Sequence, residues 1–150
     1  MSLDLLALRQ AVADHGPLIR VLVVGTAGSA PREAGTSMLV WDGGQDGTIG
    51  GGTLEWEAVR HAREMLATGK SRALRTIALG PTLGQCCGGS VTLAWEGHGP
   101  GDLPPFLPYP REIVAGAAAP SLDWIAGQLA RSQDGDPPVE HDGWLVEGAP

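Results

Sequence analysis

The sequence predicts a single α/β domain, α+β-like in organisation, in which a mixed β-sheet packs against about three helices. Segments with apolar residues at helical spacing alternate with β-branched apolar runs, which is the main sign of this class. No internal repeat is visible along the 150 residues, and this length suits one domain. The composition, 43% hydrophobic and 18% charged, is that of a folded protein.

The first two predicted elements are an amphipathic helix and a buried strand. Leu5, Leu8 and Val12 recur at helical spacing. Gly16-Pro17 then ends this helix. Residues 18–26 form a β-branched, almost wholly apolar run, which is typical of a strand buried on both faces.

A second strand, a turn and a long helix are expected next. The loop of residues 27–35 leads to a strand over 37–41, and the Asp- and Gly-rich turn of 42–47 suits a hairpin tip. Residues 48–53 open onto the helix, and Gly69 closes it. The apolar stripe of this helix consists of Leu54, Ala58, Val59, Ala62, Met65 and Leu66.

The second half of the chain is predicted to hold two further strands, a third helix and a short last strand. Residues 72–79 and 90–96 indicate strands on either side of a cysteine-containing loop. Residues 97–110 are rich in Pro and Gly and are expected to be irregular. A last short strand is expected within residues 139–146. The third helix is marked by Leu122, Ile125 and Leu129.

Cys86 and Cys87 are the only cysteines, and they stand side by side among turn-forming glycines. Neighbouring side chains diverge in a helix or a strand, so this pair can converge on one ligand only in a loop. A thiolate is both a nucleophile and a soft metal ligand. Free Cys is also among the most buried residue types, and an isolated pair more often packs under a tight turn. A disulfide between them would be strained, because adjacent Cα atoms are closer than the roughly 4.4–6.8 Å usual for disulfides.

Charge and the absence of targeting features restrict the compartment and the partners. The net charge of −7 argues against nucleic acid and anionic membrane surfaces, which both select clustered Lys and Arg. No charged-then-apolar leader and no long apolar run is visible, so we expect a reducing cytoplasm. An anionic ligand would have to be held locally, by backbone N–H groups and a single Arg.

Gly50, Gly51 and Gly52 stand just before the long helix, where backbone N–H groups lack intrahelical partners. An anionic group fits such a place. The run is not a dinucleotide fingerprint, because Glu55 stands where the third glycine would be needed. Gly69-Lys70-Ser71 is not a P-loop, because it ends a helix. Glu55 lies in the first turn, where it either complements the helix dipole or accepts an N–H of a ligand.

Other candidate residues carry weaker signals. Arg32 follows Pro31 in a loop, and its guanidinium suits a phosphate, although a lone loop Arg is more often solvated. His61, His98 and His141 share no metal-ligand spacing. We interpret these three histidines as ordinary polar residues.

Three Gly-rich motifs follow one another between about residues 19 and 96. The first is Gly28-Ser29-Ala30-Pro31-Arg32 with Gly35. The second runs from Gly47 to Glu55, and the third joins Leu79-Gly80-Pro81 to Leu83 through Gly89. Taken together they resemble the XdhC/CoxI family, the accessory proteins of xanthine dehydrogenase and related molybdenum hydroxylases.

The resemblance implies a function for the chain. Proteins of this family are cytoplasmic chaperones that bind molybdenum cofactor (molybdopterin) while a cysteine desulfurase supplies its sulfido ligand. They then deliver it to a molybdenum hydroxylase such as xanthine dehydrogenase. The resemblance therefore implies an accessory protein rather than an enzyme, with no catalytic residues, and it favours a homodimer.

The resemblance also implies which residues bind the cofactor. The two thiols, Cys86 and Cys87, would lie near the cofactor as ligands of its metal. Gly50, Gly51 and Gly52 would lie at its phosphate-bearing end. The other residues implied in cofactor binding are Gln85, Gly88, Arg32 and Glu55.

Longer members of the family carry a Rossmann-like C-terminal domain, which the sequence does not contain. We interpret residues 1–150 as the N-terminal domain of the family, either isolated or in a naturally short form. Two alternatives stay open on the residues alone. One is a thiol redox protein that uses the Cys86-Cys87 pair, and the other is a structural module that docks on a desulfurase or hydroxylase.

Overall fold

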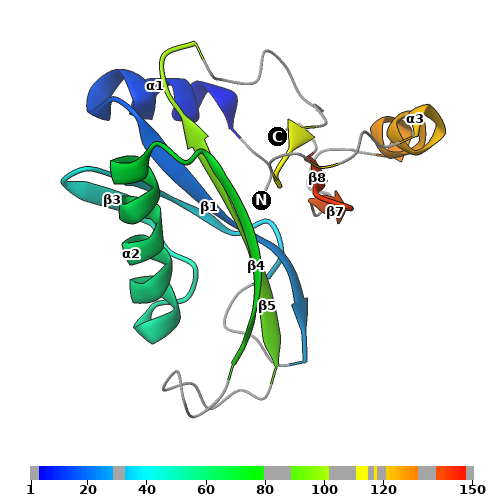
Figure 1. Cartoon of the computed structure of the whole chain (residues 1–150), viewed down its shortest axis with the longest axis horizontal. Helices are drawn as coiled ribbons and strands as arrows, with labels where there is room; N and C mark the ends of the chain where they lie inside the picture. Colours follow the sequence, from blue (N-terminus) through cyan, green and yellow to red (C-terminus); the bar gives the residue numbers. More distant parts are fainter. Residues whose placement is uncertain are drawn as a thin grey trace.

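The computed structural model describes residues 4–28, 33–79, 89–101, 111–114, 117, 121–131 and 138–147. These residues contain three helices and eight strands (Figure 1). The N-terminal elements are α1 (Leu5–His15), β1 (Leu18–Ala27), β2 (Ser37–Trp41), β3 (Gly44–Gly47), α2 (Gly52–Thr68) and β4 (Arg72–Ala78). The remaining elements are β5 (Ser90–His98), β6 (Arg111–Glu112), α3 (Leu122–Arg131), β7 (Val139–His141) and β8 (Trp144–Val146).

The strands form two sheets. One has five strands in the order β3-β2-β1-β5-β4, and the other has three in the order β6-β8-β7. Every strand pair among the described residues is antiparallel. Figure 1 shows α2 on one side of the five-stranded sheet and the small sheet with α3 on the other. The predicted α/β class with three helices, α+β-like in organisation, is confirmed.

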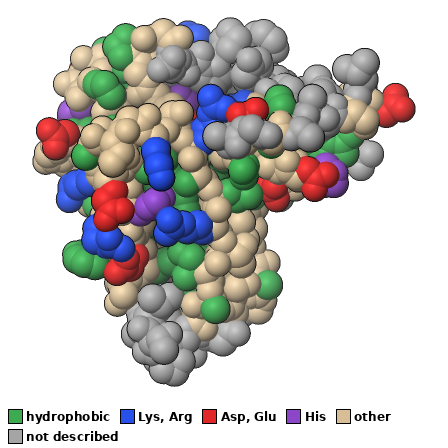
Figure 2. Space-filling view, viewed as in Figure 1, with side chains coloured by type: hydrophobic (Ala, Val, Ile, Leu, Met, Phe, Trp, Pro, Cys, Tyr) green, Lys and Arg blue, Asp and Glu red, His purple; other side chains and the backbone are tan. Residues whose placement is uncertain are grey.

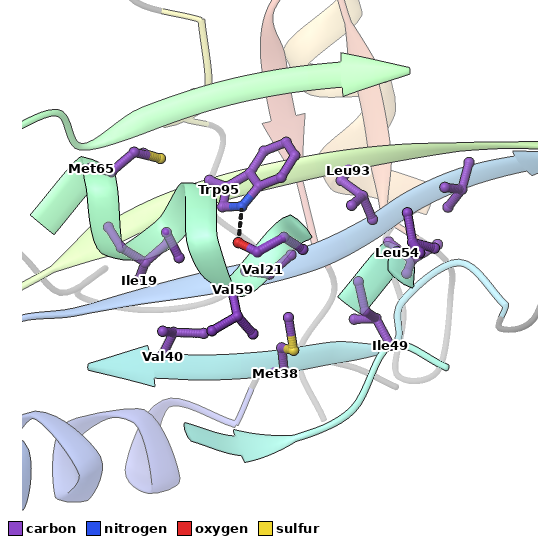
Figure 3. Close-up of a cluster of buried hydrophobic side chains, with 14 of the residues drawn as sticks. Ile19, Val21, Met38, Val40, Ile49, Leu54, Val59, Met65, Leu93 and Trp95 are labelled. Carbon is purple, nitrogen blue, oxygen red and sulfur yellow. Dashed lines mark hydrogen bonds between the residues drawn. The ribbon is translucent and has the colours of Figure 1, made fainter. Parts of the chain in front are cut away.

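One face of the five-stranded sheet holds the main apolar core. Alternate residues of a strand point to the same face, so Ile19, Val21 and Val23 of β1 all face α2. Leu93 and Trp95 of β5 join them, opposite the predicted apolar stripe of α2 (Figure 3). The indole N–H of Trp95 donates to the Ala58 carbonyl of α2 over 3.1 Å. The core is therefore apolar, and its one buried indole N–H has a partner.

The opposite face is covered in two parts. Leu8 and Val12 of α1 pack on Leu18 at one end of β1. Farther along β1, Leu22 packs against Leu145 of the small sheet. The Asp4 carboxylate accepts backbone N–H groups at the start of α1, which satisfies donors that a helix leaves unpaired.

Four charged side chains are buried between the two sheets, and we call them the ionic cluster: Arg20, Glu96, Arg111 and Glu147. Arg20 and Glu96 are paired across β1 and β5 in the sheet register. Arg111 belongs to β6, and Glu147 follows β8. The cluster therefore joins the five-stranded sheet to the small one.

Several elements differ from the predicted ones, and the two-residue strand β6 was not predicted. The expected hairpin tip over 42–47 holds strand β3, whose Gly- and Asp-rich sequence resembles a turn. Residues 139–146 form a hairpin of two strands around Asp142-Gly143 rather than one. β5 continues to His98, because its pairing with β1 extends beyond the predicted end at Glu96. No helix in the described ranges has the length and apolarity needed to cross a membrane.

Candidate functional site

The glycine run before α2 has a backbone that favours glycine. Gly50, Gly51 and Gly52 have φ values of 123°, 76° and 67°. Residues with a Cβ rarely adopt such φ values. The three consecutive glycines therefore allow the backbone to turn sharply just before the helix begins. A Cβ built on Gly51 would meet no atom within 4 Å. The conformation, and not a lack of space, therefore restricts this position to glycine.

Glu55 occupies the position that an anion would take at this helix start. Its Oε1 accepts the backbone N–H of Ile49 over 3.0 Å and that of Gly51 over 3.3 Å. The Thr48 hydroxyl donates to the same oxygen and accepts the N–H of Gly50 over 3.1 Å. The carboxylate thus caps α2 and brings a negative charge to the positive end of the helix. The predicted residues Gly50, Gly51 and Glu55 are therefore brought together.

A groove of about 690 Å³ begins at this loop and follows the exposed side of α2. Gln45 of the edge strand β3 forms part of its wall. Its lining residues from the helix are Gly52, Glu55, Trp56, Val59, Arg60, Arg63, Glu64 and Ala67. The volume lies within the roughly 300–1,000 Å³ that is usual for small-molecule sites.

The groove combines an exposed aromatic ring with cations. Trp56 is 63% exposed, which is unusual for so large an apolar side chain. The guanidinium of Arg60 lies 5.9 Å from the centre of the Trp56 ring and is held by Glu57 and Glu64, each over 2.6 Å. The hydrogen bond with Glu57 is the main reason that the pKa of Arg60 is raised. Arg63 is exposed and has no ion pair within the described residues.

The remaining predicted site residues cannot be placed. Arg32 and the segment 85–88 lie outside the described residues. This segment contains Gln85, Cys86, Cys87 and Gly88, so the structure does not test a role for the two thiols. Within the described ranges, no group of three or more His, Cys, Asp or Glu side chains could hold a metal ion.

Sequence reasoning did not select the groove residues Trp56, Arg60 and Arg63. The sequence nevertheless contains a pattern that groups these residues. They are four and three positions apart, so they lie on one face of the helix, outside the apolar stripe of α2. A Trp on the polar side of a helix is exposed, and exposed apolar surface of this kind can mark a binding site.

Comparisons with known proteins bear on the family and the fold of the chain. No curated protein matches the chain. A crystal structure described as a xanthine dehydrogenase from Bacillus halodurans is similar in fold, with a TM-score of 0.55 and 24% sequence identity over 65% of this chain. The chain covers 30% of the length of that protein. Residues 11–77 match the family model described as the XdhC and CoxI family. This match confirms the resemblance predicted from the motifs, and it extends over residues 11–77, from within α1 to β4.

Proposed function

We propose that this chain takes part in the maturation of a molybdenum enzyme, by binding molybdenum cofactor and assisting its sulfuration and insertion. The recipient would be a molybdenum hydroxylase such as xanthine dehydrogenase, and a cysteine desulfurase would supply the sulfur. The match of residues 11–77 to the XdhC and CoxI family model supports this proposal. In this role the protein is an accessory factor, acts in the cytoplasm and forms a homodimer.

The groove along α2 is the single observation that carries the proposal. The cofactor presents a flat pterin ring and a phosphate, and the groove offers a matching surface to each. Trp56 exposes an aromatic face suited to stacking on the ring, and Arg63 has a guanidinium suited to the phosphate. The backbone at Gly52 opens into the same groove.

Glu55 refines the expected role of the glycine loop. Because this carboxylate already accepts the N–H groups of Ile49 and Gly51, a phosphate at that position would meet a negative charge. We therefore place the phosphate near Arg63 and give Glu55 the role of holding the loop. The chemistry at the metal would be left to the thiols of Cys86 and Cys87.

The experiment measures cofactor retention. The protein is mixed with freshly released molybdenum cofactor and passed through gel filtration, and molybdenum and pterin fluorescence are measured in the protein peak. Trp56→Ala and Arg63→Gln should each reduce retention of both signals about tenfold, as expected for the loss of one stacked ring or one charged contact. Arg9→Gln, an exposed arginine on α1, is the matched control and should retain the wild-type amount.

Cysteine variants separate the two ends of the ligand. Cys86→Ser and Cys87→Ser should reduce retention of the sulfurated molybdenum form while leaving metal-free pterin binding largely intact. Gly51→Val should weaken the retention of the sulfurated form and of metal-free pterin alike, because a β-branched residue disfavours a φ of 76° and moves the loop. Absence of any co-elution at micromolar wild-type protein would refute the proposal. Partner binding without cofactor retention would favour the docking-module alternative instead.

A further inference from the structure

A second and smaller pocket lies on the other flank of α2, between the helix and the edge strand β4. Its volume is about 190 Å³. Its apolar wall consists of Leu54, Ala58, Ile77 and Trp95. Its polar rim consists of Glu57, Arg60, His61 and Arg75. The pocket is thus an apolar recess with polar groups gathered along one side, which is the usual composition of a small-ligand site.

His61 brings an unpaired ring nitrogen to this pocket. Its Nε2 is buried and has no hydrogen-bond partner among the described residues. The ring lies edge to face on Trp95, with centroids 4.7 Å apart, and its Nδ1 is 3.9 Å from the Glu64 carboxylate. Most buried polar atoms in folded proteins are hydrogen-bonded, so an unpaired nitrogen at the wall of a pocket indicates a place for a ligand atom.

Arg75 brings a positive charge that the fold does not use. In the register of β4 and β5 it pairs with Leu93, so it lies on the α2 side of the sheet, between Ala73 and Ile77. The side chain of Arg75 is exposed, because β4 is the edge strand of the sheet. Arg75 has no ion pair within the described part of the chain, whereas Arg60 on the same rim is held by Glu57 and Glu64. Figure 2 shows Lys and Arg side chains, together with Asp or Glu side chains, around a histidine on this face.

The charged groups near His61 come from α2, from Lys70 just after this helix, and from β4. Burial is the main cause that lowers the pKa of His61, and the charge of Arg75 on β4 lowers it further. Arg60 and Lys70 act in the same direction, and Glu64 opposes them. The imidazole is therefore neutral near pH 7, and a bound anion would favour its protonated form.

We propose that this pocket binds a small planar organic anion. Arg75 pairs with the anionic group, the Nε2 of His61 forms a hydrogen bond with the ligand, and Ile77 and Trp95 contact the flat apolar body. The volume is below the roughly 300–1,000 Å³ of sites for drug-sized ligands, so a single substituted ring fits better than a cofactor. The pocket adjoins the groove of Trp56 and Arg63 at Arg60, which lines both, but its proposed ligand does not depend on the proposed function.

The test uses benzoate as the probe and the full chain at pH 7. Binding is followed by NMR, on the ring protons of His61 and on the indole N–H of Trp95. Arg75→Gln should weaken benzoate binding about tenfold, the effect of losing one charge-assisted hydrogen bond, and Arg75→Lys should weaken it less. His61→Gln should weaken it severalfold. Arg63→Gln, which removes an exposed cation from the other flank of α2, should leave it unchanged.

Two further comparisons make the outcome decisive. Benzamide, which has the same ring without the charge, should bind far more weakly than benzoate. Benzoate should also raise the pKa of His61, and benzamide should not. The proposal is overturned if benzoate does not perturb His61 and Trp95, or if it binds equally well to Arg75→Gln and His61→Gln proteins with native circular dichroism. Equal binding of benzamide would also overturn it.

Discussion

The two faces of the five-stranded sheet are held in different ways. On the α2 face, contact is almost wholly apolar, and the buried residues include Val21, Leu93 and Trp95. On the other face, the small sheet is joined through the ionic cluster of Arg20, Glu96, Arg111 and Glu147 as well as through apolar contacts. Both candidate ligand sites lie along the flanks of α2.

The difference has a physical consequence for each face. Apolar packing is non-directional, so α2 can present polar side chains on its outer surface at little cost to its attachment. A buried ion pair is directional, and removing one partner leaves an uncompensated charge. Attachment of the small sheet should therefore depend on every member of the ionic cluster. The α2 side should depend mainly on the volume of the apolar side chains that fill it.

The largest effect is expected from Glu147→Ala. Glu147 accepts two hydrogen bonds from Arg20, over 2.7 and 2.8 Å, and a further one from Arg111. Its removal leaves two buried guanidinium groups without this partner. We expect a loss of about 3–5 kcal/mol in the free energy of unfolding, measured by urea denaturation. A loss below about 1 kcal/mol would show that the cluster does not hold the small sheet.

A truncation in the apolar core should cost somewhat less. Leu93 is fully buried on the α2 face. Leu93→Ala should destabilise the protein by about 2–5 kcal/mol, through lost transfer free energy and the cavity left behind. Leu93→Met, which nearly keeps the volume, is the matched control and should cost less than about 1.5 kcal/mol. If both variants were equally destabilised, volume would not be the controlling property of this face.

Acid should weaken the two faces unequally. Burial alone would raise the pKa of Glu147, but the charge of Arg20 and its hydrogen bonds hold that pKa below the ordinary value of a glutamate, 4.5. Arg111 likewise lowers the pKa of Glu96 against the effect of burial. A carboxylate with a lowered folded-state pKa stabilises the protein above its unfolded pKa, and this contribution is lost as the pH falls through the folded value. Stability should therefore fall below about pH 4.5.

The dependence of the free energy of unfolding on pH should differ between variants of the two faces. Glu147→Ala should flatten the loss of stability at acid pH, because one of the groups responsible is gone. Leu93→Ala should keep the wild-type slope, since it removes no titrating group. Urea denaturation at a series of pH values from 3 to 7 provides the measurement, with ~1 pH unit between points. Identical pH slopes in the two variants would contradict the conclusion that Glu147 contributes to the loss of stability in acid.

The smallest effect is expected at the rim of the small sheet. Arg72 pairs with Glu112 over 2.6 Å, and the two side chains are 41% and 27% exposed. Solvent screens such a pair, so Arg72→Gln should change the free energy of unfolding by less than about 1 kcal/mol. A larger loss, seen in the same urea titration, would mean that the ionic network extends beyond its four buried members.

The sequence predicted best those elements whose signal is local. α2 was predicted because its apolar stripe has helical period and Gly69 closes it, with a φ of 76° in the structure. β1 was predicted from its β-branched run. β3 was not, because Gly and Asp dominate a short edge strand and resemble a turn. The two-residue strand β6 is too short to leave a pattern.

The ionic cluster could not be predicted, because its members are distant in sequence. Arg20 and Glu147 are separated by 127 residues, and only the fold brings them together. A single charge inside an apolar run, as at Arg20, was the available sign of a buried partner. The role of Gly50, Gly51 and Gly52 at the start of α2 could be predicted, because the start of a helix has a local sequence pattern. Whether Glu55 faced a ligand or its own loop depended on the backbone geometry.

The most direct test compares cofactor retention and stability in two variants, one for each face. The Trp56→Ala, Arg63→Gln double variant and the Glu147→Ala variant are each mixed with released molybdenum cofactor and passed through gel filtration, and their urea midpoints are measured. We predict at least about tenfold lower retention in the double variant with an unchanged midpoint. Glu147→Ala should lower the midpoint and leave retention per folded molecule unchanged. Wild-type retention by the double variant, or a loss confined to Glu147→Ala, would contradict a cofactor site on the α2 face.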